Sequence, residues 1–103
     1  METDEKERPP PAVLKLFVSG SMPGGRRALE NLRRSRDVLG AVGYSIEVVD
    51  SLERPGEADA AGIMVMPTLS DESAVPARRL VCDLSDIAWV VEFFSGSGKI
   101  GKS

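Results

Sequence analysis

The sequence predicts a single α/β domain whose strands and helices follow one another in the order βαβαββα. Three observations predict this fold class. Apolar runs rich in β-branched residues alternate with segments of helical periodicity. Pro23 and Pro55 stand where two of the helices are expected to begin. The chain has 103 residues, which suffices for one hydrophobic core.

The first half of the chain predicts a strand, a helix and a second strand. Residues 13–18 are a short apolar run typical of a buried strand, and residues 44–50 alternate polar and apolar side chains as a second strand does. Between them a helix is expected from Pro23, with Gly40 as its stop. Its buried face is predicted to carry Ala28, Leu29, Leu32, Ser35 and Leu39. This succession predicts a right-handed parallel βαβ unit.

The second half predicts a short helix, a hairpin and a final helix. Residues 51–62 contain Pro55 and several alanines, the composition of a short, weak helix. The apolar residues 63–66 meet Pro67, which opens the third strand, and this segment is expected to pair with residues 77–82. Ser85 is predicted to cap the last helix. The stripe that faces the core is predicted to be Ile87, Val90, Val91 and Phe94. The complete order is that of a thioredoxin-like fold.

The two ends differ in composition from the part able to pack. Residues 1–12 are rich in charge and proline and predict a flexible arm, residues 13–94 form the domain, and residues 95–103 predict a flexible Gly/Ser/Lys tail. The net charge of −3 argues against nonspecific binding to nucleic acid or to anionic membranes. A membrane span and a signal peptide are not expected, so the interpretation is a cytoplasmic protein.

The residue types needed for catalysis are scarce. In a thioredoxin-like enzyme the loop after the first strand carries a reactive thiolate, but here it reads Ser21-Met22-Pro23-Gly24. The chain has no histidine and one cysteine, Cys82, so zinc chemistry and disulfide exchange are not expected. No enzyme activity, metal or cofactor is therefore predicted. The alternative from another class is a glutathione-binding enzyme that uses Ser21.

The last eight residues match the phosphate-loop pattern G-x-x-x-x-G-K-S. Such a loop joins a strand to a following helix whose first amides bind the phosphates. Here the pattern follows a predicted helix and stands at the end of the sequence, so the interpretation is a chance match.

Several exposed positions are candidates for binding a partner protein. The first helix carries a basic face that includes Arg26, Arg27, Arg33 and Arg34, and Arg26 and Arg27 lie where the helix dipole disfavours positive charge. Adjacent Arg78 and Arg79 must point to opposite faces of a strand, so one of them needs water, a carboxylate or a partner.

The last helix has a second apolar side formed by Trp89 and Phe93, which lie four residues apart. An exposed aromatic pair of this kind marks an interface. A self-associating sensory or scaffold module is therefore a third hypothesis, and a homodimer or homotetramer is the expected assembly.

Several segments resemble the KaiB family of circadian clock proteins, in family order and spacing. They are residues 13–20 (VLKLFVSG), 27–32 (RALENL), 48–50 (VVD), 66–69 (MPTL) and 76–85 (PARRLVCDLS). The resemblance implies a non-enzymatic protein that binds the KaiC-type hexameric ATPase, in circadian timing or a related stress or signalling process. A KaiA-like protein or a histidine kinase is the further partner it implies.

The resemblance also implies particular residues and a second fold. Lys15, Arg27 and Arg79 match basic positions of the family, and Tyr44, the first residue of the second predicted strand, is a further candidate for binding a partner. The family is known for a tetrameric ground state of order βαββααβ, which is the alternative fold here. Pro67 and Pro76 match prolines in the half that refolds, and slow X-Pro isomerisation would help to separate two such states.

Overall fold

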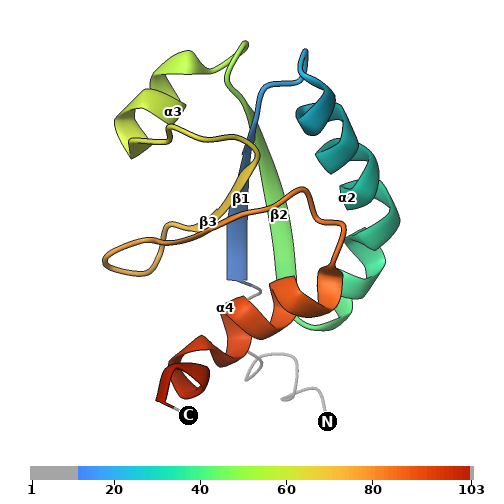
Figure 1. The fold of residues 1–103 in the computed structure, drawn as a ribbon, viewed down its shortest axis with the longest axis vertical. Helices are drawn as coiled ribbons and strands as arrows, with labels where there is room; N and C mark the ends of the chain where they lie inside the picture. The colour runs from blue at the N-terminus through green and yellow to red at the C-terminus, as the bar shows by residue number, and fades with distance from the viewer. Residues whose placement is uncertain (1–11, 103) are drawn as a thin grey trace, which may run out of the picture.

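The computed structural model describes the backbone of residues 12–102 and the side chains of residues 12–95 (Figure 1). The observed order is βαβαββα, as predicted, and not the alternative βαββααβ. The elements are β1 (Ala12–Val18), α2 (Pro23–Ala41), β2 (Tyr44–Asp50), α3 (Pro55–Ala61), β3 (Thr68–Asp71), β4 (Arg78–Val81) and α4 (Ile87–Lys102).

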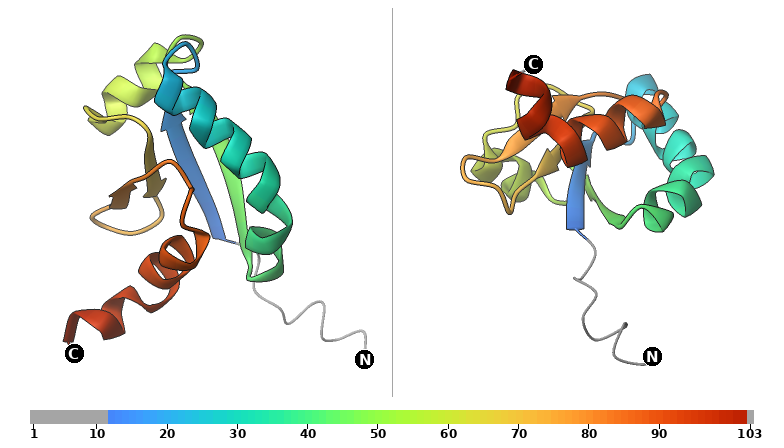
Figure 2. Two further views of the ribbon diagram at one scale, coloured as in Figure 1. Left: turned by 45° about the vertical axis from the view of Figure 1, so that its right-hand side comes forward. Right: turned by 90° about the horizontal axis from the view of Figure 1, so that it is seen from below.

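The four strands form one mixed sheet of order β2-β1-β3-β4. β1 pairs in parallel with β2, and the hairpin of β3 and β4 is antiparallel to β1 through β3. Helices α2 and α4 cover one face of the sheet, while α3 packs against one end of the other face (Figures 1 and 2). The sheet is therefore covered along one face and only in part on the other.

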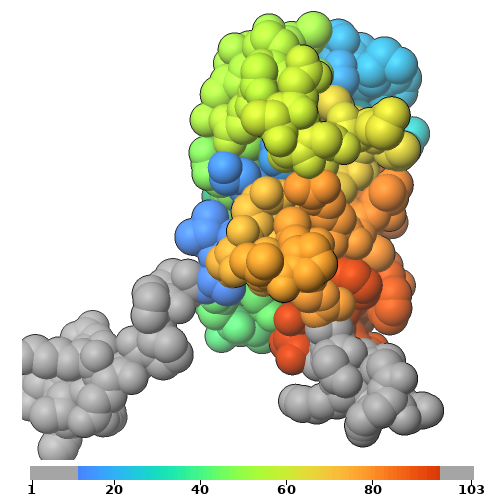
Figure 3. Space-filling model, turned by 90° about the vertical axis from the view of Figure 1, so that its left-hand side faces the viewer, coloured from blue at the N-terminus to red at the C-terminus, as the bar shows by residue number. Residues whose placement is uncertain are grey.

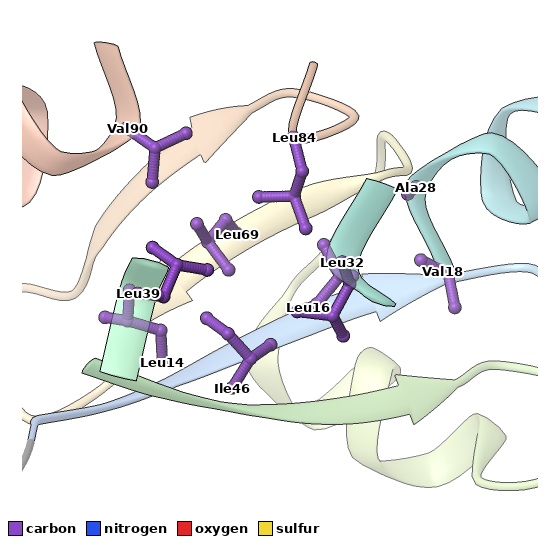
Figure 4. Close-up of a cluster of buried hydrophobic side chains, with 10 residues drawn as sticks. All are labelled: Leu14, Leu16, Val18, Ala28, Leu32, Leu39, Ile46, Leu69, Leu84 and Val90. Carbon is purple, nitrogen blue, oxygen red and sulfur yellow. The ribbon is translucent and has the colours of Figure 1, made fainter. Parts of the chain in front are cut away.

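The main core lies between the sheet and the two long helices. Leu16 and Leu69 occupy paired register positions on β1 and β3, and both are fully buried. Figure 4 shows the buried cluster, which comprises Leu14, Leu16, Val18, Ala28, Leu32, Leu39, Ile46, Leu69, Leu84 and Val90. A smaller cluster on the other face joins Phe17 and Val49 to Ala58 of α3. The predicted buried faces of both long helices are confirmed.

Helix α2 begins very close to the end of β1. A Cβ atom on Gly25 would lie 2.1 Å from the carbonyl oxygen of Ser19, so only glycine fits there. At its other end the helix runs one residue beyond Gly40, the predicted stop. The chain instead turns at Gly43, whose φ of +95° is a conformation that favours glycine. The approach at Gly25 fixes the loop of residues 19–22 between strand and helix.

The third strand opens after Pro67, as predicted, whereas the cap of the last helix differs from the prediction. Residues 63–66 are not a strand: they form the connection between α3 and β3, and the side chain of Met64 is 91% exposed. Strand β3 starts after Pro67, where alternation brings Leu69 onto the core. The cap of α4 is Asp86, whose Oδ1 accepts a hydrogen bond from the Trp89 amide at 3.1 Å. Ser85 instead donates its amide to Asp83 Oδ1.

The predicted ends lie largely outside the described side chains. The expected arm of residues 1–12 falls outside the described residues except for Ala12, which belongs to β1. Helix α4 continues to Lys102 through most of the segment expected to be a tail, and Ser103 is not described. Residues 96–102 of the phosphate-loop pattern thus lie within a helix and do not follow a strand. Within residues 12–102, no helix combines the length and apolarity needed to cross a membrane.

Candidate partner-binding surface

The loop between β1 and α2, where a thioredoxin-like enzyme holds its thiolate, carries hydroxyl groups. Ser21 is exposed, and its Oγ lies 3.4 Å from Oγ of Ser19. With no histidine in the chain, a hydroxyl at this place lacks the usual base that would activate it. No observation in the described structure favours glutathione chemistry at Ser21. Among the described residues, no cluster of three or more potential metal ligands was found either.

The partly covered face of the sheet carries a polar row that crosses all four strands. The register places Glu47 of β2 beside Lys15 of β1, Lys15 beside Ser70 of β3, and Ser70 beside Arg79 of β4. Because side chains at directly paired positions point to the same face, these four side chains form one line. Figure 3 shows this side of the molecule, with α3 above and the β3–β4 hairpin below it.

Lys15 lies near the centre of this row and is held by an acidic residue of α3. Its Nζ donates to Oε2 of Glu57 at 2.7 Å. This hydrogen bond raises the pKa of Lys15 and lowers the pKa of Glu57. Arg54 binds Glu57 at 3.2 Å and Glu47 at 3.2 Å, so two cations and two carboxylates form one network. Lys15 therefore acts as part of a positioned network, with its side chain about one-third exposed (31%).

Arg79 ends the row and is paired within its own hairpin. Its guanidinium donates to Oε2 of Glu72 at 3.0 Å and to Oγ of Ser70 at 3.1 Å, and Ser70 also donates to Glu72. Partial burial acts to raise the pKa of Glu72, but the hydrogen bonds from Ser70 and Arg79 outweigh it, so the pKa of Glu72 is lowered. The hairpin thus holds Arg79 in a fixed position at the edge of the sheet.

The arginines of α2 lie on the opposite side of the sheet from this row. Arg26 and Arg33 are exposed, and neither takes part in an ion pair among the described residues. Arg34 pairs with Glu30, four positions earlier on the same helix, at 3.5 Å. Arg27 reaches Asp83 at the long distance of 3.7 Å, and its side chain is 59% exposed. Of the family-matched basic residues, Arg27 is the most accessible.

The aromatic pair of α4 lies against β4. The Trp89 and Phe93 rings are 5.9 Å apart, and the guanidinium carbon of Arg78 lies 4.7 Å from the centre of the Phe93 ring. This distance is within the range of a cation–π interaction. Arg78 and Arg79 do point to opposite faces, and each has found a partner: an aromatic ring for Arg78 and a carboxylate for Arg79.

The ten residues predicted to bind a partner therefore do not form one patch. Lys15 and Arg79 share the partly covered sheet face, and Arg78 joins Trp89 and Phe93. The four α2 arginines form a third group, and Tyr44 is half-buried against the core at the start of β2. Of the two predicted prolines, Pro67 lies directly before β3 and Pro76 lies in the loop between β3 and β4, and the peptide bonds before both are cis.

Sequence reasoning missed the acidic residues that hold the basic ones. Glu57 reaches Lys15 from α3 across 42 positions in the chain, and no local pattern marks such a contact. Glu72 and Arg79 face each other across a hairpin whose register was not predicted. Arg54 was not singled out because its importance comes from where the β2–α3 turn places it.

The fold and the site together define a class of protein. The chain is a thioredoxin-like domain without the cysteine pair of the redox enzymes, and it carries charged and aromatic surfaces instead. The family model described as "KaiB domain" matches residues 15–93, so the chain belongs to the KaiB family. The prediction made from its sequence motifs is confirmed.

Relatives agree with this assignment, and a solved structure shares the fold. A protein named circadian clock oscillator protein KaiB from Synechococcus elongatus is 38% identical over 74 residues, which is 72% of either chain. Its namesake in Prochlorococcus marinus is 36% identical over 100 residues, covering 82% of this chain and 84% of the relative. The solution structure of the N-terminal domain of Synechococcus elongatus SasA is similar in fold, with a TM-score of 0.62, 18% identity and 84% coverage of each chain.

Proposed function

We propose that this chain is a non-enzymatic regulator that binds a KaiC-type hexameric ATPase, in circadian timing or a related stress or signalling process. The observation that carries the proposal is the family match over residues 15–93, with curated relatives named as clock oscillator proteins. The serine and glycine at the positions of the redox cysteines support a role in binding rather than in catalysis.

The basic residues differ in how readily they can meet a partner. Lys15 and Arg79 are each about one-third exposed (31% and 33%) and already hold short hydrogen bonds to carboxylates. Arg27 is 59% exposed, and its contact with Asp83 is long. An acidic group of the ATPase would exchange with Asp83 at little cost, because exposed ion pairs contribute only about 0–1 kcal/mol. Arg27 is thus the first candidate for a direct contact.

The remaining partner proposals follow from the same resemblance. A KaiA-like protein or a histidine kinase is a further partner, and a homodimer or homotetramer is the proposed free assembly in the cytoplasm. The similarity in fold to the N-terminal domain of SasA is compatible with a surface shared among proteins of this architecture. The net charge of −3 favours protein partners over nucleic acid.

Native mass spectrometry of the protein with the KaiC-type ATPase of its host and ATP tests the proposal. A complex is expected, and Arg27→Glu is expected to weaken it by about tenfold or more if the arginine makes a charged contact with the ATPase. Arg36→Glu is the matched control, because it makes the same charge change on the same helix at an exposed position that carries no family match. No complex with the wild-type protein would overturn the proposal.

A further inference from the structure

The two edges of the sheet differ in what their outer main-chain groups contact. In the β3–β4 ladder the Cys82 amide donates to the Pro67 carbonyl, which fixes the alternation of the hydrogen bonds along β4. Leu80 and Arg78 therefore also direct their main-chain groups toward β3. The amide and carbonyl groups of Arg79 and Val81 consequently point away from the sheet, along its outer edge.

On the opposite edge, on β2, one outward main-chain group is bonded to a side chain. The Ala12 amide donates to the Gly43 carbonyl, so the groups of β2 that face β1 belong to odd-numbered residues and the Val48 carbonyl points outward. The Arg54 guanidinium donates to that carbonyl at 2.9 Å. In the described part of the chain no corresponding side chain reaches the outward groups of β4. The edge of β4 is thus the more open of the two.

Exposed apolar side chains lie on both sides of the open edge. Val81, on the partly covered sheet face, is 61% exposed. On the other side α4 passes below the hairpin (Figures 1 and 2), and Trp89, in contact with Phe93, is 44% exposed. A strand that pairs with β4 would alternate its side chains between Val81 and this aromatic pair. Exposed aromatic and aliphatic groups beside an open edge are typical of strand-addition sites.

Arg78 supplies a charge for this site. Its guanidinium lies over the Phe93 ring and has no ion pair among the described residues, whereas Arg79 is matched by Glu72. Its side chain points to the face on which α4 lies, so it stands beside the aromatic pair. A carboxylate directly across from Arg78 would complete a charged contact there.

We propose that the outer edge of β4 and the aromatic pair of α4 form a docking site for an extended acidic and apolar segment of a partner protein. The segment adds as a fifth, antiparallel strand. Read from its N-terminus, it places an apolar residue opposite Val81, an apolar residue opposite Leu80, a polar residue opposite Arg79 and Asp or Glu opposite Arg78. The site requires no contact with the α2 arginines, so it is distinct from the contact proposed for Arg27.

A second copy of this chain fits the edge less well than such a segment. Pairing two β4 strands would gather both copies of Arg78 and Arg79 along one seam and bring no carboxylate to Arg78. Like charges at close cross-strand positions are destabilising. Charge complementarity therefore favours an acidic partner segment.

The test is a titration of the full-length protein with a capped hexapeptide of sequence Ser-Val-Leu-Thr-Glu-Ser. Trp89 is the single tryptophan of the chain, so its fluorescence reports on the site directly. Saturable binding is expected, and replacing the glutamate of the peptide by lysine is expected to weaken it about tenfold or more, the effect of losing a charged hydrogen bond.

Two protein variants distinguish strand addition at the β4 edge from binding that does not use the main-chain groups of β4. Val81→Pro removes an outward amide and leaves the β3–β4 hydrogen bonds in place, because proline is tolerated on edge strands. Val81→Thr is the matched control that keeps the amide, and circular dichroism checks that both variants fold.

Loss of peptide binding in Val81→Pro with retention in Val81→Thr supports the proposal. Equal binding by both variants, no binding by the wild type, or a β4-dependent dimer in sedimentation that excludes the peptide would each overturn it. Because the titration contains no ATPase, its result is separate from that of the proposed function.

Discussion

The close approach between α2 and β1 makes a sharp prediction for two neighbouring glycines. In Gly25→Ala the new Cβ would lie 2.1 Å from the Ser19 carbonyl oxygen, far below the 3.0 Å that real contacts respect. In Gly24→Ala the new Cβ would meet only Cδ of Pro67, at an ordinary 3.6 Å. The same chemical change therefore introduces a main-chain clash at one position and none at the next.

The magnitude follows from the contacts that must change. Overpacking costs about 1–3 kcal/mol. The Ser19 carbonyl also accepts the Met22 amide at 3.0 Å, and losing that hydrogen bond adds about 1 kcal/mol. Exchanging a helical glycine for alanine returns about 0.5–1 kcal/mol in either variant. Gly25→Ala should lose roughly 1–3 kcal/mol of unfolding free energy, and Gly24→Ala should be neutral or gain up to about 1 kcal/mol.

Urea unfolding followed by circular dichroism measures both variants against the wild type. A loss of 1 kcal/mol corresponds to a fall in Tm of about 4–8 °C for a domain of this size, so thermal unfolding gives a second reading. Equal stability of Gly25→Ala and Gly24→Ala would refute the reasoning, because it would show that Ser19 and α2 separate at no cost.

Three further predictions concern the cap, the ion pair and the thiol. In urea unfolding, Asp86→Ala should lower the free energy of unfolding by about 1 kcal/mol, and Ser85→Ala should lower it by less. If Ser85 were the cap, Ser85→Ala would have the larger effect. The Lys15–Glu57 pair should add stability that is lost as the pH rises through the raised pKa of Lys15, and lost again as the pH falls through the lowered pKa of Glu57. In Glu57→Gln the free energy of unfolding, measured by urea at a series of pH values, should accordingly change less with pH at both extremes than in the wild type. The same pH dependence in both proteins would contradict the assignment. Burial raises the pKa of the Cys82 thiol, so iodoacetamide should alkylate it more slowly in the folded than in the urea-unfolded protein, as mass spectrometry would show.

The sequence predicted the fold well where one local signal dominated. The βαβ unit combines a strand that is apolar except for Lys15, a 3.6-residue stripe and an alternating strand, and these patterns agree with the buried positions. The third strand was predicted to open at Pro67 and begins at Thr68, and the apolar residues 63–66 before it form a connection although their composition resembles a strand. Hydrophobicity alone does not distinguish a buried strand from a partly exposed connection.

The candidate site was predictable only in its cations. Arginines and lysines stand out in an acidic sequence, but the carboxylates that orient them come from other elements. Glu57 and Glu72 depend on the packing of α3 and on the register of the hairpin. In the sequence Arg54 is an ordinary turn residue, and its contacts with the edge of β2 are visible only in the folded structure. The chemistry of this surface is therefore a property of tertiary structure.

The contrast between the two sheet edges bears on how the molecule could pair with further strands. Growth of an open chain of subunits through sheet pairing needs two free edges on each copy, one to give and one to receive. With the Val48 carbonyl bonded to Arg54, the β2 edge offers an interrupted row of free main-chain groups to an incoming strand. Arg54 therefore works against continued sheet growth at the edge opposite the proposed docking site.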